Sequence, residues 1–179
     1  SEFGTEIDVS KPTILFSPTW KGSAVNNAQD DVEQIVSETL KLVDEFSDQY
    51  NVLIKVHPFA YANVKKDNRI SDYLISDLVD ANEVLSFVDI LVTDYSSIFF
   101  DFMVTGRPII FYAWDKDLYN FERGMYLKES ELPGPTAENL TELIETIYNI
   151  GEVSLTYKTK YEFLAEKMVN YDNGEATSK

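Results

Sequence analysis

Short apolar runs alternate with amphipathic stretches along most of this 179-residue chain. The runs have the length and the β-branched or aromatic content of buried strands, and they cover 13–16, 51–56, 90–92 and 109–112. Between and after them, apolar residues recur at helical spacing, which predicts helices over 29–47, 81–87, 98–103, 138–150 and 157–169. Strands that alternate with helices form a parallel sheet covered on both faces. The pattern therefore predicts an α/β fold of the Rossmann-like kind.

Two further segments carry weaker signals. Segment 61–69 is polar and contains asparagine, which favours a loop, and segment 73–75 has the make-up of a short strand. At the start, Ser1–Thr5 resembles a cloning-vector remnant, which implies a part cut from a longer protein, and a polar lead-in follows it. We therefore assign residues 1–9 to the remnant and the lead-in, and residues 10–179 to a single domain.

The chain is strongly acidic, with 31 aspartate and glutamate residues against 15 lysine and arginine residues and a net charge of −16. Such a surface argues against nonspecific nucleic-acid binding and against a polybasic membrane patch, because both need clustered cations. An anionic ligand would have to be held locally, by helix dipoles and a few focused cations. The lack of cysteine excludes disulfides and thiolate metal sites, and one histidine excludes a multi-histidine metal site.

The stretch 90–102 predicts a strand, a tight turn and a helix. Asp94, Ser96 and Ser97 at the turn are residue types that cap helix N-termini. In an open parallel sheet, ligands bind outside the carboxyl ends of the strands, and a helix N-terminus with free N–H groups suits phosphate. The same residues would equally suit an ordinary capped helix that binds nothing.

Four strand ends should meet at one edge of such a sheet. Besides the turn at Asp94, they carry Thr19-Trp20-Lys21, His57-Pro58 and Trp114-Asp115. The single histidine, His57, could donate to a phosphate oxygen or move a proton near neutral pH, and a structural role is the alternative. Trp20 could grip a ligand or simply cover the edge of the sheet.

Other kinds of site have less support. The chain has no G-x-G-x-x-G and no P-loop motif, and its serines lack the G-x-S-x-G context of a hydrolase nucleophile. A Ser-His-Asp triad is therefore poorly supported. A magnesium site could be built from Asp94, Asp101, Asp115 and Asp117, although exposed acids are expected at this net charge.

A series of motifs resembles one known family. The motifs are Ile14–Lys21, Lys55–Pro58, Thr93–Asp101, Arg107–Tyr112, Glu122–Tyr126, Leu132–Pro135 and Asp172–Thr177. In this order they resemble the C-terminal domain of the CDP-glycerol glycerophosphotransferases, which build the poly(polyol phosphate) chains of teichoic acids. Members that use CDP-ribitol share these motifs. The resemblance spans about residues 12–177.

The resemblance implies a GT-B-like enzyme made of two Rossmann-like domains, of which this chain is the donor-binding C-terminal half and the N-terminal acceptor domain is absent. CDP-glycerol or CDP-ribitol would bind at the strand ends, with its pyrophosphate at Ser96 and Ser97. His57 would be catalytic and would stabilise charge on the leaving CMP. Lys21, which stands where the family often has arginine, and Arg123 would supply positive charge. The implied substrate-binding residues are Thr19, Trp20, Lys21, His57, Pro58, Asp94, Ser96, Ser97, Asp115, Glu122, Arg123 and Gly124.

The implied reaction is polyol-phosphate transfer to an acceptor hydroxyl in teichoic acid or a related bacterial cell-envelope polymer. The base that deprotonates the acceptor would be a histidine of the absent domain, so we expect this chain alone to bind donor weakly and to be nearly inactive. No tightly bound cofactor is implied, and magnesium is one candidate divalent cation. The acceptor would be a polymer or lipid-linked molecule, nucleic acid is not expected as a partner, and the full-length protein would act in the cytoplasm at the inner face of the membrane. The alternatives are a nucleotide-sugar glycosyltransferase domain of GT-B type and a non-catalytic binding domain.

Overall fold

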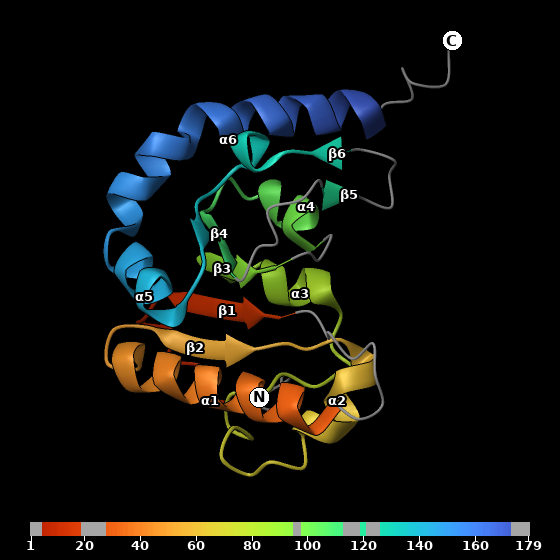
Figure 1. Ribbon diagram of the computed structural model, residues 1–179, viewed down its shortest axis with the longest axis vertical. Helices are drawn as coiled ribbons and strands as arrows, with labels where there is room; N and C mark the ends of the chain where they lie inside the picture. The colour runs from red at the N-terminus through yellow and green to blue at the C-terminus, as the bar shows by residue number, and fades with distance from the viewer. Residues whose placement is uncertain (1–4, 19–27, 95–97, 113–118, 121–125, 173–179) are drawn as a thin grey trace.

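The centre of the molecule is a five-stranded parallel sheet (Figure 1). The computed structural model describes residues 5–18, 28–94, 98–112, 119–120 and 126–172. The strands are β1 (Thr13–Ser17), β2 (Asn51–Ile54), β3 (Ile90–Thr93), β4 (Ile109–Tyr112) and β7 (Thr136–Ala137). Their order in the sheet is β2-β1-β3-β4-β7. The crossover from β1 leads to β2 on one side of it, and the crossover from β2 returns past β1 to β3 on the other side. This order confirms the predicted Rossmann-like α/β fold.

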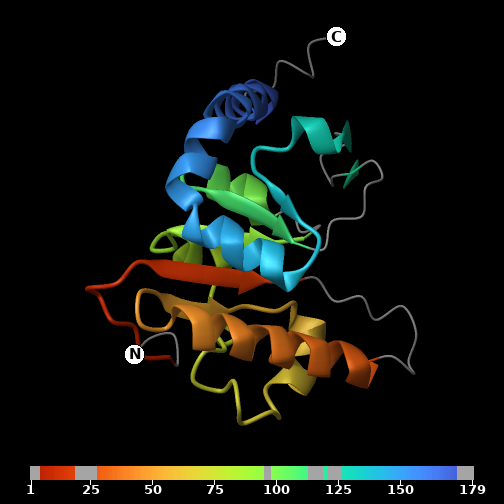
Figure 2. The same ribbon diagram turned by 60° about the vertical axis from the view of Figure 1, so that its left-hand side comes forward.

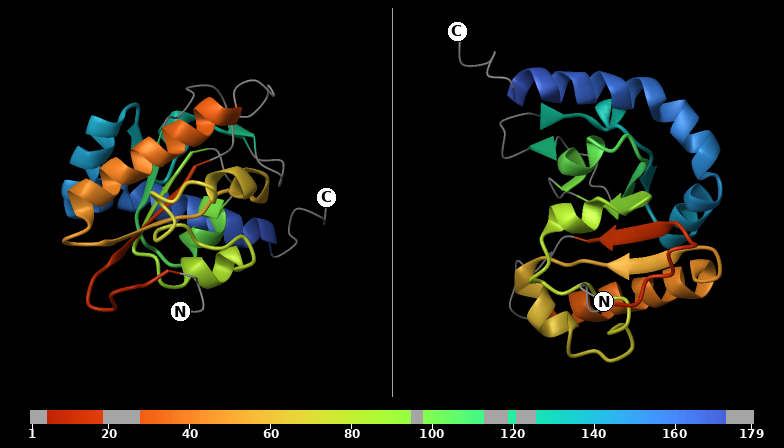
Figure 3. Two further views of the ribbon diagram at one scale, coloured as in Figure 1. Left: turned by 90° about the horizontal axis from the view of Figure 1, so that it is seen from below. Right: turned by 180° about the vertical axis from the view of Figure 1, so that it is seen from behind.

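Helices cover both faces of the sheet (Figure 2). One face carries α1 (Ala28–Phe46), α2 (Pro58–Val64) and α5 (Leu140–Tyr148). The other carries α3 (Ala81–Leu85), α4 (Ile98–Met103) and α6 (Ile150–Asp172). The helix α6 begins beside α5 and arches over to α4 (Figure 3), where Leu164 and Met168 are buried.

Successive side chains of a strand point to opposite faces of the sheet, so the core consists of two clusters. On β1, Ile14 and Phe16 join the cluster under α1, α2 and α5, whereas Leu15 joins the cluster under α3, α4 and α6. All three side chains are at most 1% exposed. Burial on both faces is why the sequence shows continuous apolar runs and not alternation of apolar with polar residues.

Three local predictions differ from the structure. The predicted loop over 61–69 is helical in its first part, since α2 runs from Pro58 to Val64. Proline suits the first position of a helix because it lacks only an N–H that would have no partner there. The predicted strand over 73–75 is a single parallel bridge between Ile54 and Leu74. The last two helices meet at Asn149, so α6 starts at Ile150 and not near Tyr157.

Two short pairings were not predicted. Residues 136–137 form β7, which adds one parallel strand to the edge of β4. The strands β5 (Tyr119–Asn120) and β6 (Tyr126–Leu127) pair antiparallel apart from the main sheet, and a single 3₁₀ turn over Glu129–Glu131 follows them. Strands of two residues are too short to produce a recognisable pattern of apolar and polar positions.

The start of the described chain is anchored to the sheet. The Asp8 N–H donates to Asn51 Oδ1 at 2.9 Å, and Asn51 Nδ2 donates back to the Asp8 carbonyl at 2.9 Å. Thr5 is buried. The polar lead-in expected from the sequence is therefore fixed against the amino end of β2.

Candidate functional site

The carboxyl ends of β1 and β3 lie side by side, where the strand order changes direction. Thr93 Oγ1 donates to the Ser17 carbonyl at 3.0 Å, and both residues are buried. A change of direction of this kind opens a crevice at the carboxyl edge of an α/β sheet, which is where ligands bind. Of the predicted site residues, Thr19, Trp20, Lys21, Ser96 and Ser97 follow these two strands in sequence and lie outside the described residues.

Asp94 directly follows β3 and is 4% exposed. Asp101, which was grouped with Asp94 as a candidate magnesium ligand, lies in α4 and is exposed. No cluster of three or more metal-ligating side chains occurs in the part of the chain that the structure describes.

His57 lies at the same edge, just beyond β2 on the other side of β1. Its carbonyl accepts hydrogen bonds from the N–H groups of Ala60 at 2.8 Å and Tyr61 at 3.1 Å, so His57 is the residue from which α2 starts. Pro58 occupies the first helical position, and both side chains are exposed. The backbone therefore places the only imidazole of the chain at the predicted edge with access to solvent.

Lys55 fixes the segment that leads to His57. Its N–H donates to the Phe16 carbonyl of β1 at 3.0 Å, and its Nζ donates to the carbonyl of Val79 at 3.0 Å and to that of Ser76 at 3.5 Å. Burial lowers the pKa of Lys55 below its ordinary value, and the nearby Asp77 and Asp80 oppose that shift. In the sequence, Lys55 stands out only as part of the Lys55–Pro58 motif. The position of Lys55 inside the otherwise apolar run 51–56 was the signal that its charge has a specific partner.

At the end of β4, Tyr112 connects the sheet to α1. The Tyr112 hydroxyl donates to Glu38 Oε1 at 2.8 Å, and the Tyr112 and Phe16 rings lie 6.1 Å apart between centroids. Burial, together with the hydrogen bond to Glu38, raises the pKa of Tyr112. The remaining predicted positions beyond this strand, Asp115, Glu122, Arg123 and Gly124, lie outside the described residues.

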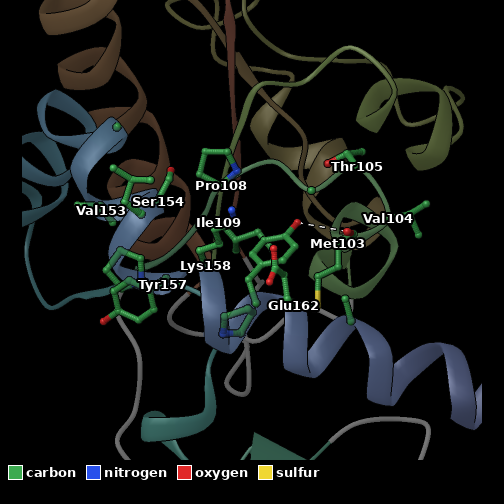
Figure 4. A pocket seen from close by; sticks show the side chains of 18 residues that line it. Met103, Val104, Thr105, Pro108, Ile109, Val153, Ser154, Tyr157, Lys158 and Glu162 are labelled. Atoms are coloured by element: carbon green, nitrogen blue, oxygen red, sulfur yellow. Dashed lines mark hydrogen bonds between the residues drawn. The ribbon is translucent and has the colours of Figure 1, made fainter.

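A groove of about 480 Å³ lies away from these strand ends (Figure 4). It is bordered by the end of α4, the Gly106–Ile109 segment, the Pro133–Pro135 turn and the first half of α6. Because Gly106 and Pro108 lead into β4, the groove opens at the amino edge of the sheet. The Tyr161 hydroxyl donates to the Met103 carbonyl at 3.3 Å across it. None of the predicted site residues lines this groove.

Comparison with known proteins assigns the family. The model of CDP-glycerol:poly(glycerophosphate) glycerophosphotransferases matches residues 2–179. The chain belongs to this family. The glycerophosphotransferase match thus covers the described strands and also the residues that follow β1, β3 and β4 in sequence.

Relatives of this glycerophosphotransferase domain include two curated bacterial proteins. A teichoic acid glycerol-phosphate transferase of Staphylococcus aureus is 34% identical over 183 aligned residues, which cover 97% of this chain and 45% of that protein. A teichoic acid poly(ribitol-phosphate) polymerase of Bacillus spizizenii is 33% identical, with 80% of this chain and 24% of that protein covered. The chain therefore spans less than half the length of these two relatives.

A solved structure of the wall teichoic acid polymerase TagF, from a variant soaked with CDPG, has a similar fold. It superposes with a TM-score of 0.66 at 25% identity, over 89% of this chain and 37% of that one. Among the described residues, no helix is long and apolar enough to cross a bilayer.

Proposed function

We propose that this chain is the donor-binding domain of a transferase that moves glycerol phosphate or ribitol phosphate from a CDP-polyol to an acceptor hydroxyl of teichoic acid or a related polymer. One observation carries the proposal. The carboxyl ends of β2, β1 and β3 are neighbours, and the segments that follow them lie within residues 2–179, which the family model matches. The names of the relatives, which are glycerol-phosphate and ribitol-phosphate transferases, support the choice of donor.

The site suits recognition of a pyrophosphate in an acidic protein. With a net charge of −16, the overall field opposes an anion, so attraction must come from groups close to it. We assign this to the N–H groups and hydroxyls at Ser96 and Ser97, with Lys21 and Arg123 as the focused cations. We also assign Asp94, which is buried at the end of β3, to the donor site. Thr19, Trp20, Pro58, Asp115, Glu122 and Gly124 complete the proposed donor site.

The proposed reaction is a single displacement at phosphorus. An acceptor oxygen forms a bond to the phosphate that carries glycerol, and the bond from that phosphorus to the bridging oxygen of CMP breaks. His57 donates a hydrogen bond or a proton to the leaving phosphate, since its imidazole is exposed at the edge. The acceptor proton passes to a base on the rest of the full-length protein. Positioning and charge stabilisation account for most of such a step.

Two assignments concern the full-length protein. We propose that residues 10–179 form one domain and that an acceptor-binding domain precedes it, because the chain covers 45% of the Staphylococcus aureus relative. We further propose that the enzyme works at the cytoplasmic face of the membrane, where its acceptor would be presented.

Thermal unfolding with a panel of ligands tests this function. A ligand that binds only the folded state at about 100 times its Kd adds about 2.7 kcal/mol of stability. For a domain of this size that corresponds to an increase in Tm of roughly 5–10 °C. We expect an increase with CDP-glycerol or CDP-ribitol, a smaller one with CMP and none with UDP-glucose. An increase with UDP-glucose alone would identify a nucleotide-sugar glycosyltransferase domain, and no increase with any ligand would indicate a domain that does not bind donor.

A further inference from the structure

Lys55 links the end of β2 to the segment Ser76–Val79, next to the parallel bridge between Ile54 and Leu74. Through its N–H it extends the pairing of β2 with β1 by one residue, since that group donates to the Phe16 carbonyl. Through Nζ it reaches the carbonyls of Val79 and Ser76. One lysine thus makes three main-chain hydrogen bonds, two of them to a segment more than 20 residues away in sequence.

The segment on the far side of this bridge leads into α3. Asp80, next to Val79, caps α3 by accepting a hydrogen bond from the Asn82 N–H at 2.7 Å. On the near side, Val56 is buried and His57 follows it. Together with the Ile54–Leu74 bridge, Lys55 therefore holds the chain where it leaves β2, two residues before the imidazole.

Partial burial of the Lys55 ammonium costs free energy, which argues that the geometry of its two hydrogen bonds matters. The lysine side chain is only partly exposed, and its cation gives up water for two neutral carbonyls. An apolar residue of similar length could cover the same surface without that penalty. The ammonium group adds directional hydrogen bonds. These fix the position of the segment Ser76–Val79 more closely than apolar contact would.

We propose that Lys55 is a positioning residue that holds His57 in the orientation required for the donor. The inference rests on the proposed function as far as the donor is concerned. The placement of His57 itself can be tested without any ligand.

The chain offers a matched control in Arg107. Its Nη1 donates to the carbonyl of Val88 at 2.7 Å and to that of Ser86 at 3.3 Å, so it too is a cation held by two main-chain carbonyls. Arg107 precedes β4 and therefore lies at the amino edge, away from His57. Lys55→Met and Arg107→Met remove the same kind of contact from opposite edges.

The test uses the imidazole signals of His57, which NMR resolves without assignment because the chain has one histidine. In the ligand-free protein we expect Lys55→Met to move or split these signals, Arg107→Met to leave them unchanged and Lys55→Arg to return them toward the wild type. If Lys55→Met does not fold, Lys55→Gln, which is neutral and too short to reach both carbonyls, replaces it. Signals that coincide with the wild type in the Lys55 variant, or that move equally in both Met variants, would overturn the proposal.

Binding of CDP-glycerol to the same proteins gives the second measurement. We expect Lys55→Met to weaken it about tenfold and Arg107→Met to leave it unchanged. Undiminished affinity in Lys55→Met would show that the lysine is structural only. If the wild type itself binds no CDP-polyol, the proposed function fails, and the ligand-free signals alone decide whether Lys55 positions His57.

Discussion

At the residue scale, the site depends on groups that are fixed by main-chain contacts. The His57 carbonyl accepts two hydrogen bonds at the start of α2, while its side chain stays exposed. Tyr112 is held by a hydrogen bond to Glu38. The sequence predicted His57 at a strand end from its neighbours alone. It could not predict the contacts of Lys55 or Tyr112, because their partners Val79 and Glu38 are distant in sequence.

Replacing His57 should separate binding from stability. In His57→Ala we expect affinity for CDP-glycerol to fall about tenfold or more, since a hydrogen bond to a charged phosphate is lost. The Tm of the free domain should stay within about 1 °C of the wild type, because an exposed side chain contributes little to stability. Calorimetric titration and thermal unfolding check the two effects, and a large fall in Tm would identify His57 as a structural residue.

The Tyr112 hydroxyl should contribute more to stability than a similar exposed one. Tyr112→Phe removes one of two donors to Oε1 of the partly buried Glu38, and Gln34 Nε2 still donates to it at 3.1 Å, so we expect a loss of about 1 kcal/mol. Tyr148 provides the control, because its hydroxyl donates to Glu45 at 2.6 Å on the surface. Tyr148→Phe should cost clearly less. Equal losses in urea unfolding would contradict the role given to burial.

At the scale of elements, periodicity predicted the helix α1 and the buried strands closely, but it missed the first turns of α6 and the shortest elements. The apolar stripe of α1 predicted 29–47, and the structure has Ala28–Phe46. The helix α2 was missed because it has only seven residues, which are too few to show a helical spacing of apolar positions. The two-residue strand β7 gave no signal because its pairing depends on the neighbouring β4.

Two glycines should respond in opposite ways to alanine. A Cβ on Gly134 would overlap the Ile109 carbonyl oxygen, so Gly134→Ala should destabilise the domain by about 3 kcal/mol through overpacking. Gly151 lies in the first turn of α6 with open space around its Cα, so Gly151→Ala should stabilise by roughly 0.5 kcal/mol. Urea unfolding measures both. If Gly134→Ala leaves the free energy of unfolding unchanged, the Pro133–Pro135 turn does not pack tightly against β4.

Arg69, in the turn after α2, forms one ion pair within that turn, to Asp67, and one to Glu33 of α1, and the pair with Asp67 should be lost in acid. Arg69 Nη2 lies 3.0 Å from Glu33 Oε2 and 2.6 Å from Asp67 Oδ2. The hydrogen bonds from Arg69 lower the pKa of Asp67 below its ordinary 3.8, so the stabilisation is complete above about pH 3.8 and is lost as pH falls through the lowered pKa.

Arg69→Gln tests these ion pairs. We expect a small decrease in Tm at pH 7 that disappears at a pH well below 3.8, where Asp67 is protonated in both proteins. Thermal unfolding across this pH range checks it. A difference in Tm that stays constant with pH would show that Arg69 acts through packing alone.

At the scale of the whole molecule, the order β2-β1-β3-β4-β7 brings His57 and the Thr93–Asp94 strand end to one edge, on the two sides of β1. The ends of β2 and β3 are therefore two strand spacings, about 10 Å, apart. Alternation of strands and helices predicted the fold class but not this order, which depends on which side each crossover takes. The amino edge carries the groove beside α4 and α6 and none of the predicted chemistry.

The most direct test of this account follows the imidazole of His57 by NMR while CDP-glycerol is added to the 179-residue protein. The single histidine gives one set of signals, so a change reports on this position alone. We predict that the signals shift and saturate with CDP-glycerol or CDP-ribitol and do not respond to UDP-glucose. Signals that stay unchanged while the CDP-polyol is shown to bind elsewhere would contradict the placement of the donor at the carboxyl ends of β1, β2 and β3.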